Sequence, residues 1–360
     1  MNKLLSKLRN LDWNKVFNIS MGIIAVLIIA FSCLYNNNLA NLLSSLPDLN
    51  KSWLIVACLS IFFVWLIDSV IIKNIARYVY PGKYSIFKAV KTTMIGQYFS
   101  SITPFGVAGQ PMQLLSLTRQ GLSSGIAISL LVSKFLIYQT VLASYSLVVL
   151  IYVFFSSNDV LKELLPFAFI GFITQAFTIG LLALFSFNKT ITDKIINAVL
   201  FLLSKLRIIK NPKQVGDKFR DQLNFYLENN KNLQKDKKLS RKLYFFSFLQ
   251  ITILFSVSFF IYKAYNNDGF PILQMIFSQS YVTMLSAYTP LPGGSGSSEG
   301  GFVLAFNMFF DYTVVTQAML LWRFITYYSC IIFGSFFARA SKKADKLEIN
   351  NTSEQQSSNN

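Results

Sequence analysis

Histidine is absent from this chain of 360 residues, and charged residues make up only 14% of it. The sequence therefore cannot form a Ser-His-Asp or Cys-His triad, an HExxH zinc site or a haem site with a histidine ligand. The three cysteines (Cys33, Cys58 and Cys330) lie far apart in apolar runs, so we expect buried thiols and neither a disulfide framework nor a zinc site. A GxxxxGK[ST] loop is also absent. We expect no metal, no cofactor and no catalytic residues of these classes.

Apolar residues are abundant, at 53% of the chain with 16% aromatic, and the mean hydropathy is +0.46. Soluble domains contain about 25% charged residues, so this composition argues against an ordinary soluble globule and against disorder in most of the chain. The net charge is +17, from 33 Lys and Arg against 16 Asp and Glu. Such an excess suits nucleic-acid binding or a membrane protein with basic loops, and the positions of the charges decide between them.

Six segments are predicted to cross a membrane, because a helix needs about 20 mostly apolar residues to span a bilayer. They lie near residues 18–35, 53–72, 124–155, 162–186, 244–264 and 314–338. The first follows a basic N-terminus, as a signal peptide would, but no A-x-A cleavage site follows it. We therefore expect the first segment to be retained as a span.

Basic residues gather on one side of this arrangement. With the N-terminus inside, 27 Lys and Arg fall on the inner side and three on the outer side. The inner residues lie in segments 1–17, 73–91 and 187–243 and in the tail after Phe337. The positive-inside rule then predicts that both termini are cytoplasmic. Because the basic residues are spread over several loops, they indicate no nucleic-acid partner.

The domain organisation follows from this orientation. Residues 1–340 are predicted to form one membrane domain with a basic cytoplasmic loop at 187–243. Within that loop, residues 190–208 have apolar residues at helical spacing, which is typical of an interfacial helix. Residues 341–360 are polar and are predicted to be a disordered cytoplasmic tail.

Two further segments, 85–121 and 271–311, each consist of two short apolar pieces separated by Pro, Gly and Ser. A bare loop cannot lie in hydrocarbon, because its amides would lack hydrogen-bond partners. A re-entrant hairpin can, if protein or a water-filled cavity surrounds the break. Paired interrupted segments of this kind point to a transport site.

The two broken segments also correspond to each other. When Thr103-Pro104 is aligned with Thr289-Pro290, Lys134 of one following span matches Arg323 of the other, to within a few residues. We predict an internal repeat with units at about 53–155 and 244–338 that enter the membrane in opposite directions. The predicted fold is all-α: a polytopic helical membrane protein with about six full spans and two re-entrant broken-helix hairpins in an inverted repeat. A duplication that only packs two bundles is the alternative.

The second break carries the more specific chemistry. Its prolines end the incoming half-helix, and its glycines permit positive φ and close backbone approach. The free amides at the start of the outgoing half-helix suit an anion such as a lipid phosphate. Glu299 is favourable there for stability alone, but an ionisable residue inside a membrane is also a functional candidate. A structural Glu299–Arg323 pair and a contact of Glu299 with a headgroup or a proton both remain open.

Basic side chains inside the spans can neutralise a lipid phosphate, and Lys134 and Arg323 are the candidates. Asp68 either pairs with Lys134 or reaches the interface. Gln97, Tyr98, Gln110 and Gln113 supply neutral hydrogen-bonding groups near the first break, or only satisfy its broken backbone. The predicted substrate-binding residues are Asp68, Pro104, Gly106, Gly109, Gln110, Lys134, Pro290, Pro292, Gly293, Gly294, Gly296, Glu299 and Arg323.

The run Pro290-x-Pro-Gly-Gly-x-Gly-x-x-Glu299, followed by Arg323, resembles the lysylphosphatidylglycerol synthase membrane-domain family, the flippase-like domain of the multiple peptide resistance factors. The run from Thr103 to Pro111 is similar to that family's first broken-helix motif, and the resemblance spans about residues 15–340. This chain differs in having Gln110 and Gln113 where acidic or basic residues are common in the family. The resemblance implies movement of lipids between leaflets and a link to antimicrobial peptide resistance.

In the full-length resistance factors, a soluble C-terminal domain transfers lysine from aminoacyl-tRNA to phosphatidylglycerol. Nothing after Phe337 matches that domain, so the resemblance implies the flippase-like half and argues against a lysyltransferase.

We therefore predict a lipid translocator, a flippase or scramblase for phospholipid, aminoacyl-phospholipid or glycolipid headgroups. The alternatives are the membrane part of a lipid-modifying enzyme and a scaffold for a separate lipid synthase. A membrane lipid is the expected partner, and a separate synthase or a second copy in a homodimer stays open. Composition rich in Lys, Asn, Ile and Phe suits an AT-rich bacterial genome and hence a bacterial plasma membrane.

Overall fold

A computed structural model describes residues 38–339, apart from 81–83, 156–158, 164, 288 and many positions between 188 and 234. The described residues form helices and contain no strand. The predicted first span at 18–35 and the tail at 341–360 lie outside the described residues, as does most of the predicted interfacial helix at 190–208. The all-α fold class is confirmed.

Four helices of the described part are long and apolar enough to cross a bilayer. They are α4 (Lys51–Val79), α7 (Ser124–Phe155), α12 (Lys237–Ala264) and the continuous helix Val314–Arg339. The last consists of α15 (Tyr312–Arg323), a π-helical segment η5 (Phe324–Tyr328) and the turns that follow it. The shorter apolar helix α9 (Leu165–Phe187) follows the one-turn helix α8 (Asp159–Glu163). The chain is a multi-pass membrane protein, with spans where the hydropathy places them.

Polar caps set the starts of two spans. The Asn50 side chain accepts a hydrogen bond from the Ser52 amide at the start of α4, and Asp236 accepts one from the Leu239 amide at the start of α12. Capping of this kind satisfies amides that have no partner inside the helix. Because Asp236 caps it, α12 begins at Lys237 and includes a basic first turn that hydropathy alone left in the loop.

Two helical hairpins pack between the spans. In the first, α5 (Ile86–Ser101) and α6 (Gly109–Arg119) are joined through the turn η3 (Pro104–Gly106). In the second, α13 (Ile272–Ser286) and α14 (Ser297–Phe306) are joined through η4 (Pro292–Gly294). The order span, half-helix, turn, half-helix, span therefore occurs twice along the chain. The short elements α3 (Asn38–Ser45) and η2 (Leu46–Asp48) precede the first span.

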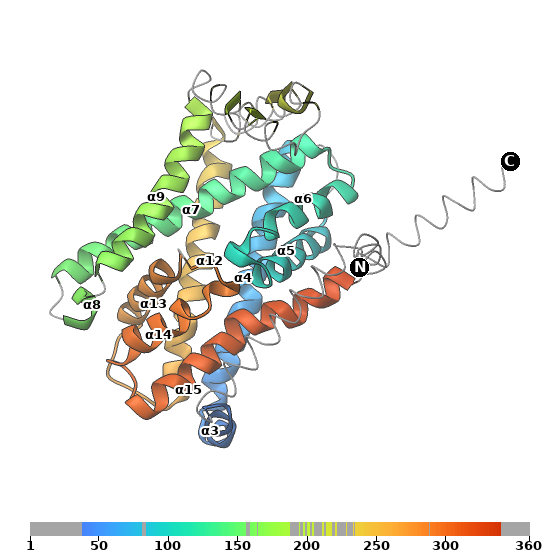
Figure 1. Ribbon diagram of the computed structural model, residues 1–360. Helices are drawn as coiled ribbons and strands as arrows, with labels where there is room; N and C mark the ends of the chain where they lie inside the picture. Colours follow the sequence, from blue (N-terminus) through green and yellow to red (C-terminus); the bar gives the residue numbers. More distant parts are fainter. Residues whose placement is uncertain are drawn as a thin grey trace, which may run out of the picture.

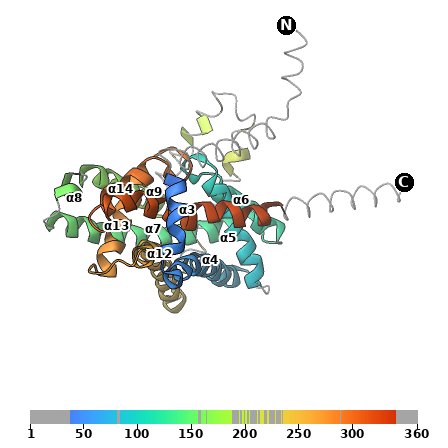
Figure 2. The ribbon, with the colours of Figure 1, turned by 90° about the horizontal axis from the view of Figure 1, so that it is seen from below.

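The two halves are built around α4 and α12, which pack together along their lengths (Figure 1). They are antiparallel, because the Asn50 amide at the start of α4 donates to the Ala264 carbonyl at the end of α12. The hairpins α5–α6 and α13–α14 lie on opposite sides of the bundle in both views (Figures 1 and 2). Their turns η3 and η4 contact each other.

The outer surface is strongly apolar, which suits a protein surrounded by lipid. Large side chains on α4, α7 and α9 are exposed, among them Phe63, Phe154, Phe155 and Phe177. A soluble monomer rarely leaves so much contiguous apolar surface uncovered. The expectation of buried cysteines is wrong for Cys58, which is exposed on this outer side of α4, whereas Cys330 is buried. Apolar sequence context indicates burial from water, and in a membrane lipid provides that burial as well as protein does.

Candidate functional site

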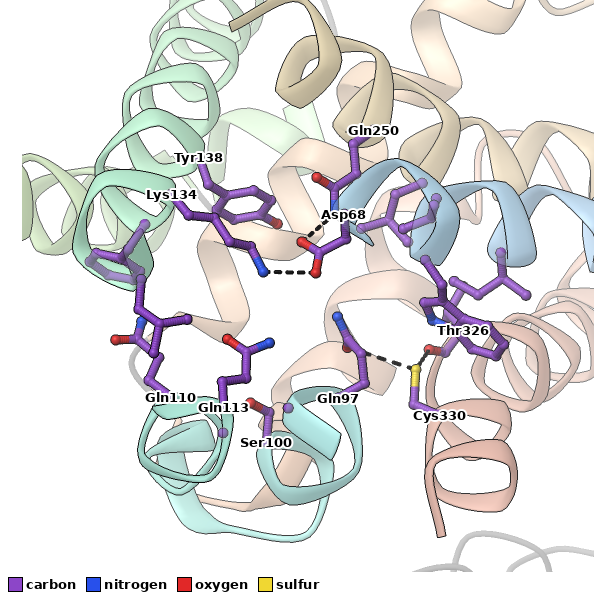
Figure 3. Close-up of a pocket in the computed structure, with 18 residues that line it drawn as sticks. Asp68, Gln97, Ser100, Gln110, Gln113, Lys134, Tyr138, Gln250, Thr326 and Cys330 are labelled. Atoms are coloured by element: carbon purple, nitrogen blue, oxygen red, sulfur yellow. Dashed lines mark hydrogen bonds and ion pairs between the residues drawn. The ribbon is translucent and has the colours of Figure 1, made fainter. Parts of the chain in front are cut away.

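A cavity of about 320 Å³ lies inside the bundle, beside the first hairpin (Figure 3). Side chains from α4, α5, α6, α7, α12 and the last span line it. The polar lining residues are Asp68, Gln97, Ser100, Gln110, Gln113, Lys134, Tyr138, Gln250, Thr326 and Cys330. Its polar lining stands out in an otherwise apolar bundle, so we take this cavity as the candidate site.

An ion pair between two spans lies in this cavity. The Nζ of Lys134 on α7 is 2.7 Å from the Oδ2 of Asp68 on α4, and the two side chains are 15% and 5% exposed. The same Oδ2 accepts a hydrogen bond from the Thr93 hydroxyl at 2.8 Å, and Oδ1 accepts one from the Gln250 amide at 3.3 Å. Both oxygens of the carboxylate are therefore engaged. A buried charge needs such partners, because removing it from water is otherwise very unfavourable.

Glutamine side chains from the first hairpin face this pair. Gln97 on α5 and Gln113 on α6 point toward Asp68 and Lys134 (Figure 3), and Gln110 lines the same cavity. Two glycines create the space. A Cβ on Gly96 would lie 2.2 Å from the Gln113 Nε2, and a Cβ on Gly109 would lie 1.8 Å from the Ser100 Oγ. The close approach of α5 and α6 thus carries the amides into the cavity.

The second hairpin holds its own ion pair. The Nε of Arg323 lies 2.8 Å from the Oε1 of Glu299, although its N–H does not point along a hydrogen bond. Arg323 also donates from Nη2 to the Gly293 carbonyl at 3.0 Å, and its guanidinium packs over the rings of Trp322 and Tyr327. The Oε2 of Glu299 accepts from the Gly296 amide at 2.7 Å, which caps α14. These contacts fit a pair that holds the break in shape.

The two breaks share an unusual backbone conformation. The second and third residues of each turn have positive φ: Phe105 and Gly106 in η3, Gly293 and Gly294 in η4. Glycine adopts such angles without steric penalty, whereas another residue there costs about 1–2 kcal/mol. A hydrogen bond at 2.8 Å from the Tyr327 hydroxyl to the Ser101 carbonyl joins the last span to the first break. A Cβ on Gly293 would lie 2.2 Å from the Tyr327 ring, so this glycine permits the close packing.

The predicted binding residues fall into two groups, those that line the cavity and those that do not. Asp68, Gly109, Gln110 and Lys134 line the cavity, and Asp68 and Lys134 form the pair that their spacing allowed. The remaining predicted residues lie outside the cavity lining, namely Pro104, Gly106, Pro290, Pro292, Gly293, Gly294, Gly296, Glu299 and Arg323. Substrate contact by any of them stays a prediction. No cluster of three Cys, Asp or Glu side chains suited to a metal occurs among the described residues.

Seven polar cavity residues were not among the predicted binding residues: Gln97, Ser100, Gln113, Tyr138, Gln250, Thr326 and Cys330, although Gln97 and Gln113 were expected near the first break. Tyr138 could have been predicted from the sequence, since it lies four residues after Lys134 and therefore on the same helix face. Gln250 could also have been predicted, because it is a neutral polar residue inside an apolar span. Thr326 could not have been predicted, because the residue pattern does not reveal the π-helical segment that turns it toward the cavity.

Comparisons with known proteins agree with this architecture. The family model described as "Lysylphosphatidylglycerol synthase TM region" matches residues 18–334. A curated relative, described as a UPF0104 membrane protein of Archaeoglobus fulgidus, is 24% identical over 304 residues, covering 82% of this chain and 89% of the relative. The matched residues include both hairpins, all residues that line the cavity and the long spans of the described part, the last of them up to residue 334. The chain therefore belongs to the family of lysylphosphatidylglycerol synthase TM regions.

Proposed function

We propose that this protein moves lipid headgroups between the two leaflets of a bacterial plasma membrane, as a flippase or a scramblase. The observation that carries the proposal is the polar cavity, with its Asp68–Lys134 pair, inside a bundle whose outer surface is apolar. A headgroup that crosses the hydrocarbon needs such a polar environment, while its acyl chains can stay in the surrounding lipid.

The pair has the chemistry to receive a lipid phosphate. Lys134 is a cation on a flexible stem, so its Nζ can exchange the Asp68 carboxylate for a phosphate oxygen. Asp68 keeps the Thr93 and Gln250 hydrogen bonds when Lys134 moves away. These hydrogen bonds from neutral groups lower the cost of leaving the Asp68 carboxylate without its cation while the cavity is occupied.

The hairpins offer a route for alternating access. The two breaks contact each other, and the spans that precede them, α4 and α12, are antiparallel. Interrupted helices in opposed repeats surround the substrate site in several transporter folds. Movement of one hairpin against the other would open the cavity toward one leaflet at a time.

Leaflet exchange in proteoliposomes tests the proposal. Purified protein is reconstituted with headgroup-labelled phosphatidylglycerol, and a membrane-impermeant quencher measures the fraction of label that reaches the outer leaflet over time. The informative variant is the double change Asp68→Asn with Lys134→Met. It removes both charges together, so no unpaired charge stays buried, and we expect the protein to fold. Exchange should fall at least about tenfold, because the cation for the phosphate is gone.

The matched control is Asp268→Asn with Lys263→Met, which removes an ion pair of the same two residue types near the end of α12, outside the cavity. It should exchange lipid at the wild-type rate. Exchange by the cavity variant at the wild-type rate would overturn the role of the pair. No exchange by folded wild-type protein, with or without an ion gradient, would overturn transport and favour a scaffold or a lipid-modifying role.

A further inference from the structure

We propose that the cavity selects a headgroup that ends in a hydroxyl-rich glycerol or sugar over one that ends in a cationic aminoacyl group. The inference rests on the proposed function and names the substrate class of the same site. It comes from the groups that line the cavity: one ion pair and several free amides.

The charge of the cavity argues against a cationic ligand. Asp68 and Lys134 are the only charged side chains in the lining of the described cavity, and they neutralise each other. Every oxygen of Asp68 already accepts a hydrogen bond or an ion pair. A lysyl headgroup would bring further ammonium groups next to Lys134 without a free carboxylate to receive them, and like charges repel more strongly beside protein and lipid than in bulk water.

The remaining polar groups suit hydroxyls. Within the described part of the chain, four groups in the lining make no hydrogen bond: the Gln110 and Gln113 amides, the Gln97 Nε2 and the Tyr138 hydroxyl. Gln113 is only 7% exposed, and buried polar groups normally have partners. An amide offers a donor and an acceptor side by side, and a hydroxyl group can satisfy both. Several amides around one cavity therefore match a ligand with several hydroxyls.

The apolar side chains that line the cavity also suit a glycerol or a sugar. Trp65, Phe135 and Tyr138 place aromatic rings beside the amides. A glycerol or a sugar presents C–H groups between its hydroxyls, and these pack against aromatic rings while the hydroxyls bind the amides. The volume of about 320 Å³ lies at the lower end of small-molecule pockets, as expected for a headgroup without its acyl chains.

The test is the same proteoliposome assay with three lipids: phosphatidylglycerol, a monoglycosyl diacylglycerol and lysyl-phosphatidylglycerol. We expect exchange of the first, the second or both at least about ten times faster than exchange of the third. Comparing exchange of the first two lipids also distinguishes a glycerol headgroup that is linked through a phosphate from a sugar headgroup that has no phosphate. Fastest exchange of the lysyl lipid would overturn the inference and leave the proposed function intact. No exchange of any lipid would overturn the proposed function itself.

A variant pair gives an independent readout. Gln113→Leu keeps the approximate size and removes the amide, so selection of the hydroxyl-rich lipids over the lysyl lipid should fall about tenfold. The control Gln175→Leu makes the same change in α9, at a buried glutamine that accepts from Ser146 and lies outside the cavity lining. It should keep wild-type selection. Unchanged selection in a folded Gln113→Leu protein would overturn the role assigned to this amide.

Discussion

At the scale of single residues, the carboxylates of Glu299 and Asp68 lie in different environments inside the bundle. Glu299 caps a helix through the Gly296 amide and holds Arg323, whose other contacts are a backbone carbonyl and two aromatic rings. Asp68 instead faces a cavity together with Lys134. The first set of contacts stabilises a turn, whereas the second leaves room for a ligand. Burial and charge do not distinguish the two environments, whereas the cavity borders only the Asp68–Lys134 pair.

Glu299→Gln tests the structural role of the first carboxylate. The amide can still cap α14, but Arg323 is left buried without a negative partner, so the protein should lose about 3 kcal/mol of stability. A lower melting temperature in detergent, with expression and lipid exchange reduced in parallel, is the expected result. The control Asp311→Asn changes an acid to an amide at the start of α15, where the side chain makes no capping bond. Normal stability with a selective loss of exchange would instead assign Glu299 to the substrate.

At the scale of elements, one close helix contact decides how α9 joins the second hairpin. A Cβ on Gly171 would lie 2.1 Å from the Met284 carbonyl oxygen, which is backbone of α13 and cannot rotate away. Gly180 is on the same helix, and a Cβ there would meet nothing within 4 Å. The two glycines therefore separate the effect of packing from the effect of helix propensity.

Gly171→Ala should destabilise the protein by about 1–3 kcal/mol, because α9 must move away from α13. Gly180→Ala should be neutral or should stabilise by up to about 1 kcal/mol, since alanine favours the helix. Thermal unfolding of the two purified variants in one detergent compares them directly. Equal melting temperatures would contradict the close contact between α9 and α13.

The π-helical segment Phe324–Tyr328 is the element that sequence could least foresee. It follows Arg323, which faces the second break, and contains Thr326, which lines the cavity beside the first. A π-helical turn shifts the side chains that follow it relative to an α-helix, and such turns are frequent at functional sites. The hydropathy of the span is the same with or without it, so no composition or spacing rule reveals it.

At the scale of the whole molecule, the distribution of basic residues predicts which end of the bundle faces the cytoplasm. Lys238 is in the first turn of α12, and Lys162 is in α8 at the opposite end of the bundle (Figure 1). Both are exposed. The positive-inside rule predicts that the end with Lys238 is cytoplasmic.

Cysteine labelling checks this orientation. In a background without the native cysteines, Lys162→Cys should react with a membrane-impermeant maleimide on intact cells whose outer envelope is open, and Lys238→Cys should react only after permeabilisation. The two variants replace the same residue type at exposed helical positions, so each is the control for the other. The reverse pattern would invert the orientation.

Much of this architecture could be predicted from the sequence. Long apolar runs located α4, α7, α12 and the last span, and the Pro and Gly breaks located both hairpins, because lipid tolerates so few backbone conformations. The cavity could not be predicted as well. Lys134 and Asp68 were found because charges are rare in spans. Gln250 and Tyr138 are also polar residues inside spans, but only the packing of the helices shows that they line the same cavity. Which charged pair borders a cavity depends on that packing alone.

The mutual neutralisation of Asp68 and Lys134 has a consequence for the response to voltage. In the proposed transport, the Asp68–Lys134 pair adds no net charge to the cargo, so the membrane potential acts at this site through the charge of the lipid. A singly charged lipid would feel about 2.3 kcal/mol per 100 mV, and an uncharged glycolipid would feel nothing. We therefore expect the electrical sensitivity of the proposed transport to follow the charge of the lipid.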